Sequence, residues 1–318
     1  MQLDPTRGYD LIGDVHGCAR TLAHLLEQLG YHKRAGVWCH PTRMALFLGD
    51  IIDRGPRIRE ALHLVHDMVA AGHALCIMGN HEFYAVGWNT PAPVGSGKTF
   101  VREHIPRHAR LIRETLEQFA DYPRDWQDFL GWMQTLPLVI DAGRFRMVHA
   151  CWDQRLITPL LAQYPEAIVD QGFVEQAAIS GSFAAQVFDR LLRGTNMLLP
   201  NGISQLSDEG FARHYFRTKF WEDDPKTYGD IVFQPGALPE TAAQMPLTAQ
   251  DKQQLLQYGL NEPMLFVGHY WRSGTPGPIR PNLACLDYSA VKYGKLVAYR
   301  LDQEPLLDPA KFCWVDVQ

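Results

Sequence analysis

The sequence lacks the features that mark several classes of protein. Six cysteines are scattered over 318 residues without any Cys-x-x-Cys pair, which indicates reduced thiols in a cytosolic protein rather than a disulfide-rich secreted domain. No run approaches the roughly 18 uninterrupted apolar residues that a membrane helix needs. The first seven residues show no positive region followed by an apolar stretch, so no signal peptide is predicted. Together these absences predict a soluble cytoplasmic protein.

Charge of one sign is not in large excess either. Lys and Arg number 30 against 35 Asp and Glu, and the net charge of −5 predicts neither DNA nor an anionic membrane as a partner. Apolar residues at 46% and charged residues at 20% exclude a disordered or collagen-like chain. Histidine, by contrast, is abundant at 13 residues, so their positions matter.

The first 80 residues alternate between short apolar runs and amphipathic segments. This pattern predicts strands at 9–12, 44–48 and 74–78 and helices at 22–29 and 58–69. Strands that alternate with helices through short loops form parallel pairs with right-handed crossovers. The N-terminal part is therefore expected to be α/β.

The remainder is expected to complete a single domain spanning 1–318, with a helical insertion at about 82–137 and a mixed insertion at about 151–230. Further strands are predicted at 138–141, 144–148, 264–267, 282–287 and 295–301. Because the last three follow one another without helices, we expect the second sheet to be more antiparallel than the first.

Polar clusters follow the first three predicted strands directly. They are Gly13-Asp14-Val15-His16-Gly17, Gly49-Asp50-Ile51-Ile52-Asp53-Arg54-Gly55-Pro56 and Gly79-Asn80-His81-Glu82. Open α/β sheets place ligands at the carboxyl ends of their strands, so these loops should converge on one crevice. Carboxylates buried there are costly unless they are paired or bound to metal. A divalent metal site is therefore expected at this edge.

Six residues that follow strands are candidate metal ligands: Asp14, His16, Asp50, Asn80, His149 and His269. Asp14 and His16 lie two residues apart in an extended turn and can reach one metal, while Asp50 can bridge to a second. Nitrogen and oxygen ligands without thiolate suit manganese, iron or zinc better than calcium. A pair of such metals is a common clamp for in-line attack on phosphorus.

These segments resemble the motifs of the calcineurin-like metallophosphoesterases, in particular the bacterial branch of phosphoprotein phosphatases and diadenosine-tetraphosphate hydrolases. The resemblance rests on GDVHG, GDIIDRG, GNHE, VHA and GHYW, which occur here in the order of the family and cover positions 9–301. Asp14 and Asp50 are 36 residues apart, and Asp50 and Asn80 are 30 apart. The resemblance implies a four-layer α/β/β/α sandwich, with two mixed sheets flanked by helices, and an enzyme that hydrolyses phosphate ester or anhydride bonds.

The resemblance also implies roles for individual residues. One metal would be held by Asp14, His16 and Asp50, and the other by the bridging Asp50 with Asn80, His149 and His269. We expect two divalent ions, with manganese first and iron or zinc as alternatives. A hydroxide that bridges them would be the nucleophile, so no covalent phospho-enzyme is expected.

Three residues are expected to act on the substrate directly or through a neighbour. His81 would be the general acid, Asp53 would orient it, and Arg54 would bind phosphate oxygens through its planar fork. Asn80 and Arg217 are further candidates for phosphate binding, although Arg217 could equally be an exposed charge on a strand.

Four other features have competing interpretations. Glu82 is interpreted as a helix-start charge rather than a ligand, and Tyr270 and Trp271 as core residues rather than a stacking surface for a base. The segment 92–99 ends in Gly-Lys-Thr like a P-loop, but no strand precedes it, so a mobile loop is favoured over a triphosphate site. The basic stretch 102–110 is interpreted as a solvated face, with steering of a phosphate substrate as the alternative.

Two substrate classes remain, phosphorylated proteins or peptides and phosphorylated nucleotides. The complete Asp53-Arg54-Gly55 block favours a Ser/Thr (or Tyr) phosphoprotein phosphatase, because dinucleoside hydrolases of this branch often alter that aspartate. The alternative, a diadenosine-tetraphosphate hydrolase, is favoured by the VHA and GHYW blocks. A catalytically silent metal-binding scaffold ranks third, since the acid candidate His81 is intact.

Overall fold

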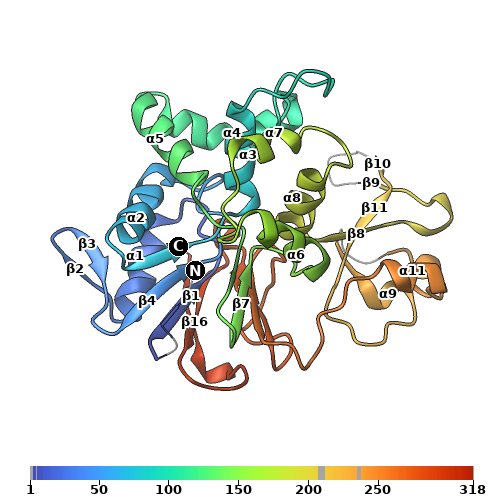
Figure 1. The fold of residues 1–318 in the computed structure, drawn as a ribbon. Coiled ribbons are helices and arrows are strands. Elements are labelled where there is room, and N and C mark those ends of the chain that lie inside the picture. The colour runs from blue at the N-terminus through green and yellow to red at the C-terminus, as the bar shows by residue number, and fades with distance from the viewer. Residues whose placement is uncertain (1–2, 5, 207–211, 235–237, 318) are drawn as a thin grey trace.

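Two large β-sheets form the centre of the molecule (Figure 1). The computed structural model describes residues 3–4, 6–206, 212–234 and 238–317. The first sheet has the order β15-β16-β1-β4-β5, with β17 also paired to β16, and the second has the order β14-β13-β7-β6. The strands of the first sheet are β1 (Gly8–Ile12), β4 (Arg43–Phe47), β5 (Ala74–Cys76), β15 (Asp287–Tyr288), β16 (Lys295–Leu301) and β17 (Phe312–Asp316). Those of the second are β6 (Val139–Asp141), β7 (Phe145–Val148), β13 (Met264–Val267) and β14 (Leu283–Cys285).

The two sheets pack face to face through their alternating apolar side chains. Leu11 and Leu46 of the first sheet share one buried core with Met147 and Phe266 of the second. The opposite faces of both sheets contribute to a larger core that includes the apolar sides of the helices. This arrangement confirms the expected four layers, because each sheet buries one face against the other sheet and one against helices.

The two helices predicted within the first 80 residues are present, and six more follow before the smaller sheet. They are α1 (Ala19–Gln28), α2 (Ile58–Ala70), α3 (Asn80–Asn89), α4 (Pro106–Phe119), α5 (Pro123–Met133), α6 (Gln154–Gln163), α7 (Gln171–Gln176) and α8 (Phe183–Arg193). In α1, for example, Leu22, Leu25 and Leu26 recur at helical spacing and are completely buried. Helices α1 and α2 contact the first sheet, which places the strand ends that follow β1 and β4 at a fixed edge.

A smaller three-stranded sheet lies to the side of the sandwich, at the right of Figure 1. It contains β8 (Thr195–Leu198), β11 (Tyr215–Thr218) and β12 (Val232–Gln234), next to the short helices α9 (Tyr228–Ile231), α10 (Glu240–Ala243) and α11 (Ala249–Gln254). Two hairpins, β2 (His32–Arg34) with β3 (Val37–Cys39) and β9 (Gln205–Leu206) with β10 (Ala212–Arg213), and three 3-10 turns (Pro200–Gly202, Ala290–Lys292 and Pro309–Lys311) complete the elements. Strand β11 matters for function because it carries Arg217.

The expectation of a more antiparallel second sheet is wrong. Strand β13 runs parallel to both β7 and β14, and only β6 pairs antiparallel in that sheet. The predicted strand at 295–301 is β16, which instead joins the first sheet antiparallel to β1. The long segment between β7 and β13 provides the crossover that a parallel pair requires, even though no helix directly precedes β13.

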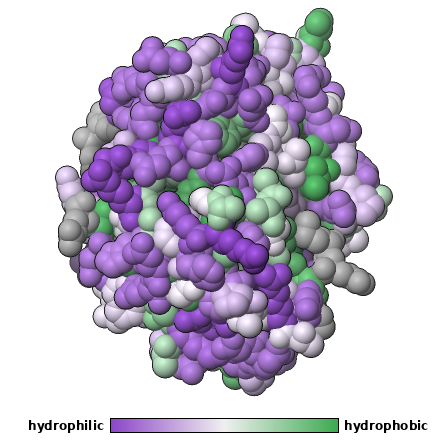
Figure 2. All heavy atoms as spheres, turned by 90° about the vertical axis from the view of Figure 1, so that its left-hand side faces the viewer, coloured by the Kyte–Doolittle hydropathy of each residue, from purple (hydrophilic) through white to green (hydrophobic). Residues whose placement is uncertain are grey.

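The surface over the first-sheet side of the molecule is mostly hydrophilic, with apolar side chains in small groups (Figure 2). Among the described residues, no helix combines the length and the apolar character needed to span a bilayer.

A buried ion cluster ties the ends of the first sheet together. Asp10 on β1 is completely buried, and both of its carboxylate oxygens accept a hydrogen bond from Nε of Arg43 at 3.0 Å. Arg43 also donates to the carbonyl of Tyr9 (2.8 Å) and to the carboxylate of Asp302 (2.5 Å). One guanidinium therefore links β1, β4 and the segment after β16.

We predict that Arg43→Met lowers the free energy of unfolding by about 3–5 kcal/mol, because it leaves the Asp10 carboxylate buried with weaker compensation. Urea denaturation followed by circular dichroism measures this change. As a matched control, Arg113→Met removes a guanidinium whose side chain is 60% exposed and paired only on the surface. The control should cost much less than Arg43→Met, because exposed ion pairs contribute little to stability. Equal losses in the two variants would contradict the importance of the cluster.

Candidate active site

The carboxyl ends of five strands bring the predicted residues to one edge of the sandwich. The loops after β1, β4 and β5 carry the three N-terminal motifs, His149 follows β7 and His269 follows β13. A cavity of about 310 Å³ opens at this edge, and among its lining residues are Asp14, His16, Asp50, Arg54, Asn80, Arg217 and His269. The buried His149 and His81 contact Asp50 from within. The structure thus gathers all six candidate ligands around one point.

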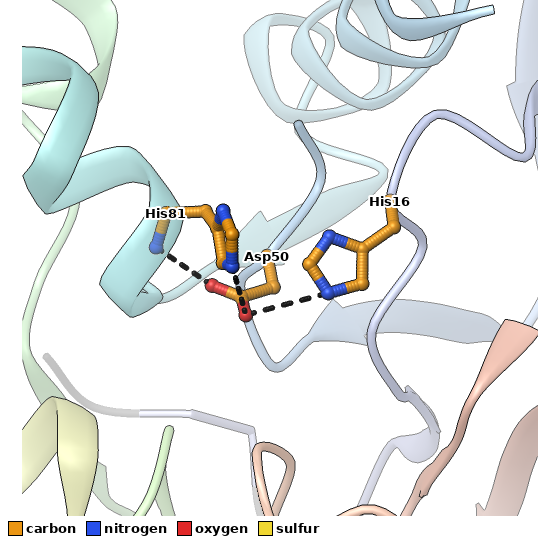
Figure 3. Close-up of side chains that lie close together, drawn as sticks. All are labelled: His16, Asp50 and His81. Atoms are coloured by element: carbon orange, nitrogen blue, oxygen red, sulfur yellow. Dashed lines mark hydrogen bonds and ion pairs between the residues drawn. The ribbon is translucent and has the colours of Figure 1, made fainter. Parts of the chain in front are cut away.

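Asp50 lies at the centre of this group. Its Oδ2 is 3.3 Å from Nε2 of His149, 3.6 Å from Nε2 of His16 and 4.0 Å from Nε2 of His81. Its Oδ1 accepts a hydrogen bond from the backbone N–H of His81 at 2.9 Å. Figure 3 shows the Asp50 carboxylate between the His16 and His81 side chains. Two sets of potential ligands, His16 with His81 and His149 with His269, share this one carboxylate.

The imidazoles are oriented by backbone carbonyls that fix their tautomers. Nδ1 of His149 lies 2.7 Å from the carbonyl of Leu48, and Nδ1 of His16 lies 2.8 Å from the carbonyl of Ile52. A carbonyl only accepts, so in a neutral imidazole Nδ1 carries the proton and Nε2 turns a lone pair towards Asp50. Oδ1 of Asn80 lies 3.1 Å from Nε2 of His149. In that neutral form several lone pairs point towards one place, and a bound cation would stabilise them.

Asp14 gives the most direct evidence that this site binds a cation. Its Oδ1 is buried without a hydrogen-bond partner among the described residues, while Oδ2 accepts from the backbone N–H of His269 at 3.2 Å. Burial, and then the Asp287 carboxylate, raise the pKa of Asp14 well above its usual range. Burial and the Arg217 guanidinium lower the pKa of His269. Burial opposes the charged form of His149, but the Asp50 carboxylate outweighs burial and raises the pKa of His149 to about 10. A buried carboxylate oxygen without a partner, together with the imidazoles and the carboxylate around Asp50, fits a pair of divalent metals.

Unusual backbone angles concentrate at the site. Among the described residues, nine non-glycine residues have a positive φ, and five of them are predicted site residues: His16 (43°), Asp50 (51°), Asp53 (67°), Arg54 (68°) and His269 (58°). The left-handed region is sparsely populated by residues with a Cβ, and such strain persists only where the surroundings hold it. The loops after β1, β4 and β13 are therefore held in conformations that their sequences do not favour alone.

Glu82 supplies much of this restraint. Its carboxylate accepts hydrogen bonds from the backbone N–H groups of Asp50 (2.7 Å), Ile51 (2.8 Å) and Gly79 (3.0 Å). Burial, and then the Asp50 charge, raise the pKa of Glu82 to about 7. As expected from its place at the start of α3, Glu82 fixes the loop after β4 and does not face the cavity.

A second group of hydrogen bonds surrounds His81. Its Nδ1 lies 2.5 Å from Oδ2 of Asp53, and the hydroxyl of Thr115 on α4 donates to the other oxygen of Asp53. Burial raises the pKa of Asp53 to about 8 and lowers that of His81 to about 3. The guanidinium of Arg54 donates to Nε2 of His81 at 3.0 Å. In this geometry Nε2 is an acceptor, so His81 is a neutral imidazole.

The structure shows where Arg217, Tyr270 and Trp271 lie, for which the sequence left alternatives open. Arg217 on β11 lines the metal cavity and is not an isolated surface charge. Tyr270 is completely buried, as expected, and its hydroxyl accepts a hydrogen bond from the N–H of Thr195. The interpretation of Trp271 as a core residue is wrong, because 47% of its surface is exposed and it lines the same cavity. The spacing along the chain does not show by itself whether a residue that follows a strand enters the core.

Sequence reasoning missed three residues of the site. Asp287 on β15 is buried beside the cavity, Lys292 lines it, and Thr115 reaches Asp53 from a helix 62 residues further along. No local motif marks these residues, since each contacts the site only through the tertiary fold. The one signal in the sequence was the position of Asp287 at the end of the apolar stretch Ala284-Cys285-Leu286, which indicates a buried carboxylate.

Comparison with known proteins agrees with this geometry. The family model described as calcineurin-like phosphoesterase matches residues 9–169, which include the three N-terminal motifs and His149. The chain belongs to the calcineurin-like phosphoesterase family. Membership of this family implies hydrolysis of phosphate esters and the binding of divalent metal ions, in agreement with the ligand groups around Asp50.

Curated relatives of this phosphoesterase are named bis(5'-nucleosyl)-tetraphosphatases. An asymmetrical one from Halalkalibacterium halodurans is 45% identical over 74 residues, which cover 23% of this chain and 30% of the relative. Another from Bacillus cereus is 44% identical over 152 residues, covering 45% and 56% respectively. A symmetrical one from Aromatoleum aromaticum is 32% identical over 140 residues, covering 44% and 42%. The matches thus span about a third to just over half of the relatives' own length.

A solved structure supports the fold over the whole chain. The cold-active protein-tyrosine phosphatase of a psychrophilic Shewanella species has a TM-score of 0.51 and 15% identity, with 100% of this chain and 83% of that chain covered. At this identity the similarity extends to the fold only.

We predict that Asp14→Asn weakens Mn²⁺ binding at least 10-fold, because the neutral amide no longer compensates a divalent charge at the buried Oδ1 position. Isothermal titration calorimetry of metal-free protein measures the affinity and the number of ions bound. Asp67→Asn, a change of the same kind at a half-exposed carboxylate on α2, serves as the control. Unchanged affinity and stoichiometry in Asp14→Asn would contradict the assignment of Asp14 as a ligand.

Proposed function

We propose that this phosphoesterase hydrolyses dinucleoside polyphosphates at a dinuclear metal centre. The observation that carries the proposal is the composition of the cavity: Arg54, Arg217 and Lys292 line it together with the half-exposed indole of Trp271. The names of the curated relatives that match the N-terminal motifs support the same substrate class. Manganese is the proposed metal, because the ligands are nitrogen and oxygen atoms without thiolate.

The cations and the indole suit the two parts of such a substrate. Guanidinium and ammonium groups bind the several charges of a phosphate chain, and an aromatic face binds a nucleobase by stacking. The Lys292 ammonium lies 5.4 Å from the centre of the Trp271 ring, so a phosphate and a base bound there would be neighbours. A single phosphoserine would leave much of this surface unused.

The metals would be held by the ligands already described, with Asp50 shared between them. When bound, divalent ions supply Lewis acidity and lower the pKa of coordinated water. In hydrolysis a water oxygen bonds to phosphorus, the bond from phosphorus to the bridging oxygen breaks, and the departing nucleotide takes up a proton. Arg54, which now donates to Nε2 of both His16 and His81, would turn to the phosphate oxygens.

His81 is the proposed proton donor, and Asp53 is the proposed positioning residue. Once Arg54 binds phosphate, Nε2 of His81 is free to carry a proton and to give it to the leaving oxygen. Asp53, held by Thr115, keeps the ring in place through Nδ1 at 2.5 Å.

A phosphoprotein phosphatase, which the intact Asp53-Arg54-Gly55 block favours, is the second candidate. The arrangement of Asp53 and His81 supports it, because a general acid matters most when the leaving group is an alkoxide. The two activities can be separated with wild-type protein.

We predict that the Mn²⁺-loaded protein hydrolyses diadenosine tetraphosphate with a kcat/KM at least about 100-fold above that for any member of a phosphoserine, phosphothreonine and phosphotyrosine peptide panel, equivalent to about 2.7 kcal/mol of transition-state binding. Malachite green and nucleotide chromatography would follow the two reactions. An equal or higher value for any phosphopeptide would make the protein phosphatase the better assignment.

A second prediction concerns the leaving group. His81→Asn should lower kcat for p-nitrophenyl phosphate or diadenosine tetraphosphate much less than for a phosphoserine peptide, where about 10²–10⁴-fold is expected for loss of an acid. The reason is that both leaving groups are stabilised anions that need little protonation: nitrophenolate in one case, and in the other a nucleotide phosphate with a pKa of about 6. A uniform loss on all substrates would argue that His81 supports the metal site rather than donating a proton.

A further inference from the structure

A second cavity adjoins the metal centre and is strongly basic. It has a volume of about 390 Å³ and lies between α3, the loop that follows it and α8. Its lining includes Lys98, Arg102 and Arg193, with Asp189 as the single carboxylate. Such an excess of positive charge in a chain whose net charge is −5 needs a physical explanation.

Two contacts connect this basic cavity to the active site. Tyr84, on its wall, lies one helical turn after His81, and the two rings are 5.9 Å apart between centres. On the other side, the carbonyl of Arg193 lies 3.1 Å from Nε2 of His269. The basic cavity therefore lies next to the active site, within reach of a chain of phosphates that begins at the metal centre.

The positive charges in the cavity are only partly compensated. Arg193 pairs with Asp189 at 2.7 Å, whereas Lys98 and Arg102 form no ion pair within the part of the chain that the structure describes. Burial, followed by nearby Arg193, lowers the pKa of Arg102. Crowded cations without a partner carboxylate are typical of an anion-binding site.

The loop that supplies these cations is well fixed. The His104 ring stacks between Trp88 (3.7 Å between centres) and Phe100 (4.1 Å), and the backbone N–H of Arg102 donates to the carbonyl of Gly87 at 2.9 Å. Segment 92–99 follows helix α3 and not a strand, so it is not a P-loop. Its Lys98 nevertheless faces the basic cavity. Of the stretch 102–110, only Arg102 lines this cavity, whereas residues 104–107 and 110 are exposed, as the interpretation as a solvated face predicts.

The aromatic rings of the wall are already partly covered by neighbouring side chains. The guanidinium of Arg102 covers the ring of Tyr84 at 3.8 Å, and Phe83 stacks on Phe188 at 3.8 Å between centres. The chemistry that remains available is that of charged nitrogen donors, which bind phosphate oxygens. A base would instead find the exposed Trp271, which lines the cavity of the metal centre.

From these observations we propose that Lys98, Arg102 and Arg193 form a second anion subsite, which binds the phosphates of a polyphosphate substrate beyond the one that reacts. The inference rests on the proposed function, because it assigns the cavity to the part of a dinucleoside polyphosphate that the metal centre does not hold. It predicts that the enzyme binds linear polyphosphates better than a single phosphate.

The test uses inorganic tripolyphosphate and inorganic phosphate as competitive inhibitors of p-nitrophenyl phosphate hydrolysis, with free Mn²⁺ held constant. In the double variant Lys98→Gln/Arg102→Gln, the inhibition constant of tripolyphosphate should rise at least about 10-fold, because each lost charge-assisted pair costs about that factor. The inhibition constant of monophosphate should change less than about 2-fold, since it binds at the metal centre alone.

Two further variants keep the result interpretable. Arg102→Lys retains the charge and should recover most of the affinity for tripolyphosphate, which also shows whether the loop still folds. Arg124→Gln, at an exposed position on α5, controls for a general loss of positive charge. An unchanged inhibition constant for tripolyphosphate in the double variant would overturn the subsite. So would a loss of affinity for an acidic phosphopeptide in place of tripolyphosphate, which would assign the cavity to a peptide.

Failure of the subsite and failure of the proposed function give different results. If the wild-type protein does not hydrolyse diadenosine tetraphosphate but the double variant loses tripolyphosphate inhibition, the subsite stands and the substrate assignment is wrong. If wild type and double variant hydrolyse diadenosine tetraphosphate equally well and are inhibited equally by tripolyphosphate, the substrate assignment stands and the subsite is wrong.

Discussion

The Asp50 carboxylate is the constraint on which the rest of the site depends. It is buried, and three imidazole nitrogens lie between 3.3 and 4.0 Å from one of its oxygens. Buried carboxylates and inward-turned lone pairs are unfavourable unless a cation compensates them. The fold tolerates this arrangement because backbone carbonyls orient His16 and His149, and because Glu82 holds the loop that carries Asp50. A bound divalent metal would compensate these unfavourable electrostatics, and this compensation would contribute to its affinity.

The sandwich explains why such distant residues meet. Parallel strands end at one edge, so loops that are 30–36 residues apart along the chain lie side by side, and β7 and β13 add His149 and His269 from the second sheet. Helices α3 and α8 line the basic cavity beside the metal centre. In the proposed function, catalysis at one phosphate and binding of its neighbours would use these strand ends together with helices α3 and α8.

The N-terminal half of this architecture could be predicted because each strand end carries a glycine and a polar cluster that local rules recognise. The positions of Asp14, Asp50 and Asn80 followed from that pattern, and the first sheet followed from alternation of strands and helices. The direction of the second sheet could not be predicted, since β13 pairs with strands far away in the sequence. The sequence also could not predict the roles of Thr115 and Asp287 or the exposure of Trp271, because the contacts that decide them form only in the folded chain.

The central claim, that Asp50 joins two metal sites, is tested most directly by anomalous diffraction from crystals of the Mn²⁺-loaded protein. The account predicts two anomalous peaks, one on each side of the Asp50 carboxylate, the first next to Asp14 and His16 and the second next to His149 and His269. A single peak, or peaks that do not contact Asp50, would contradict it.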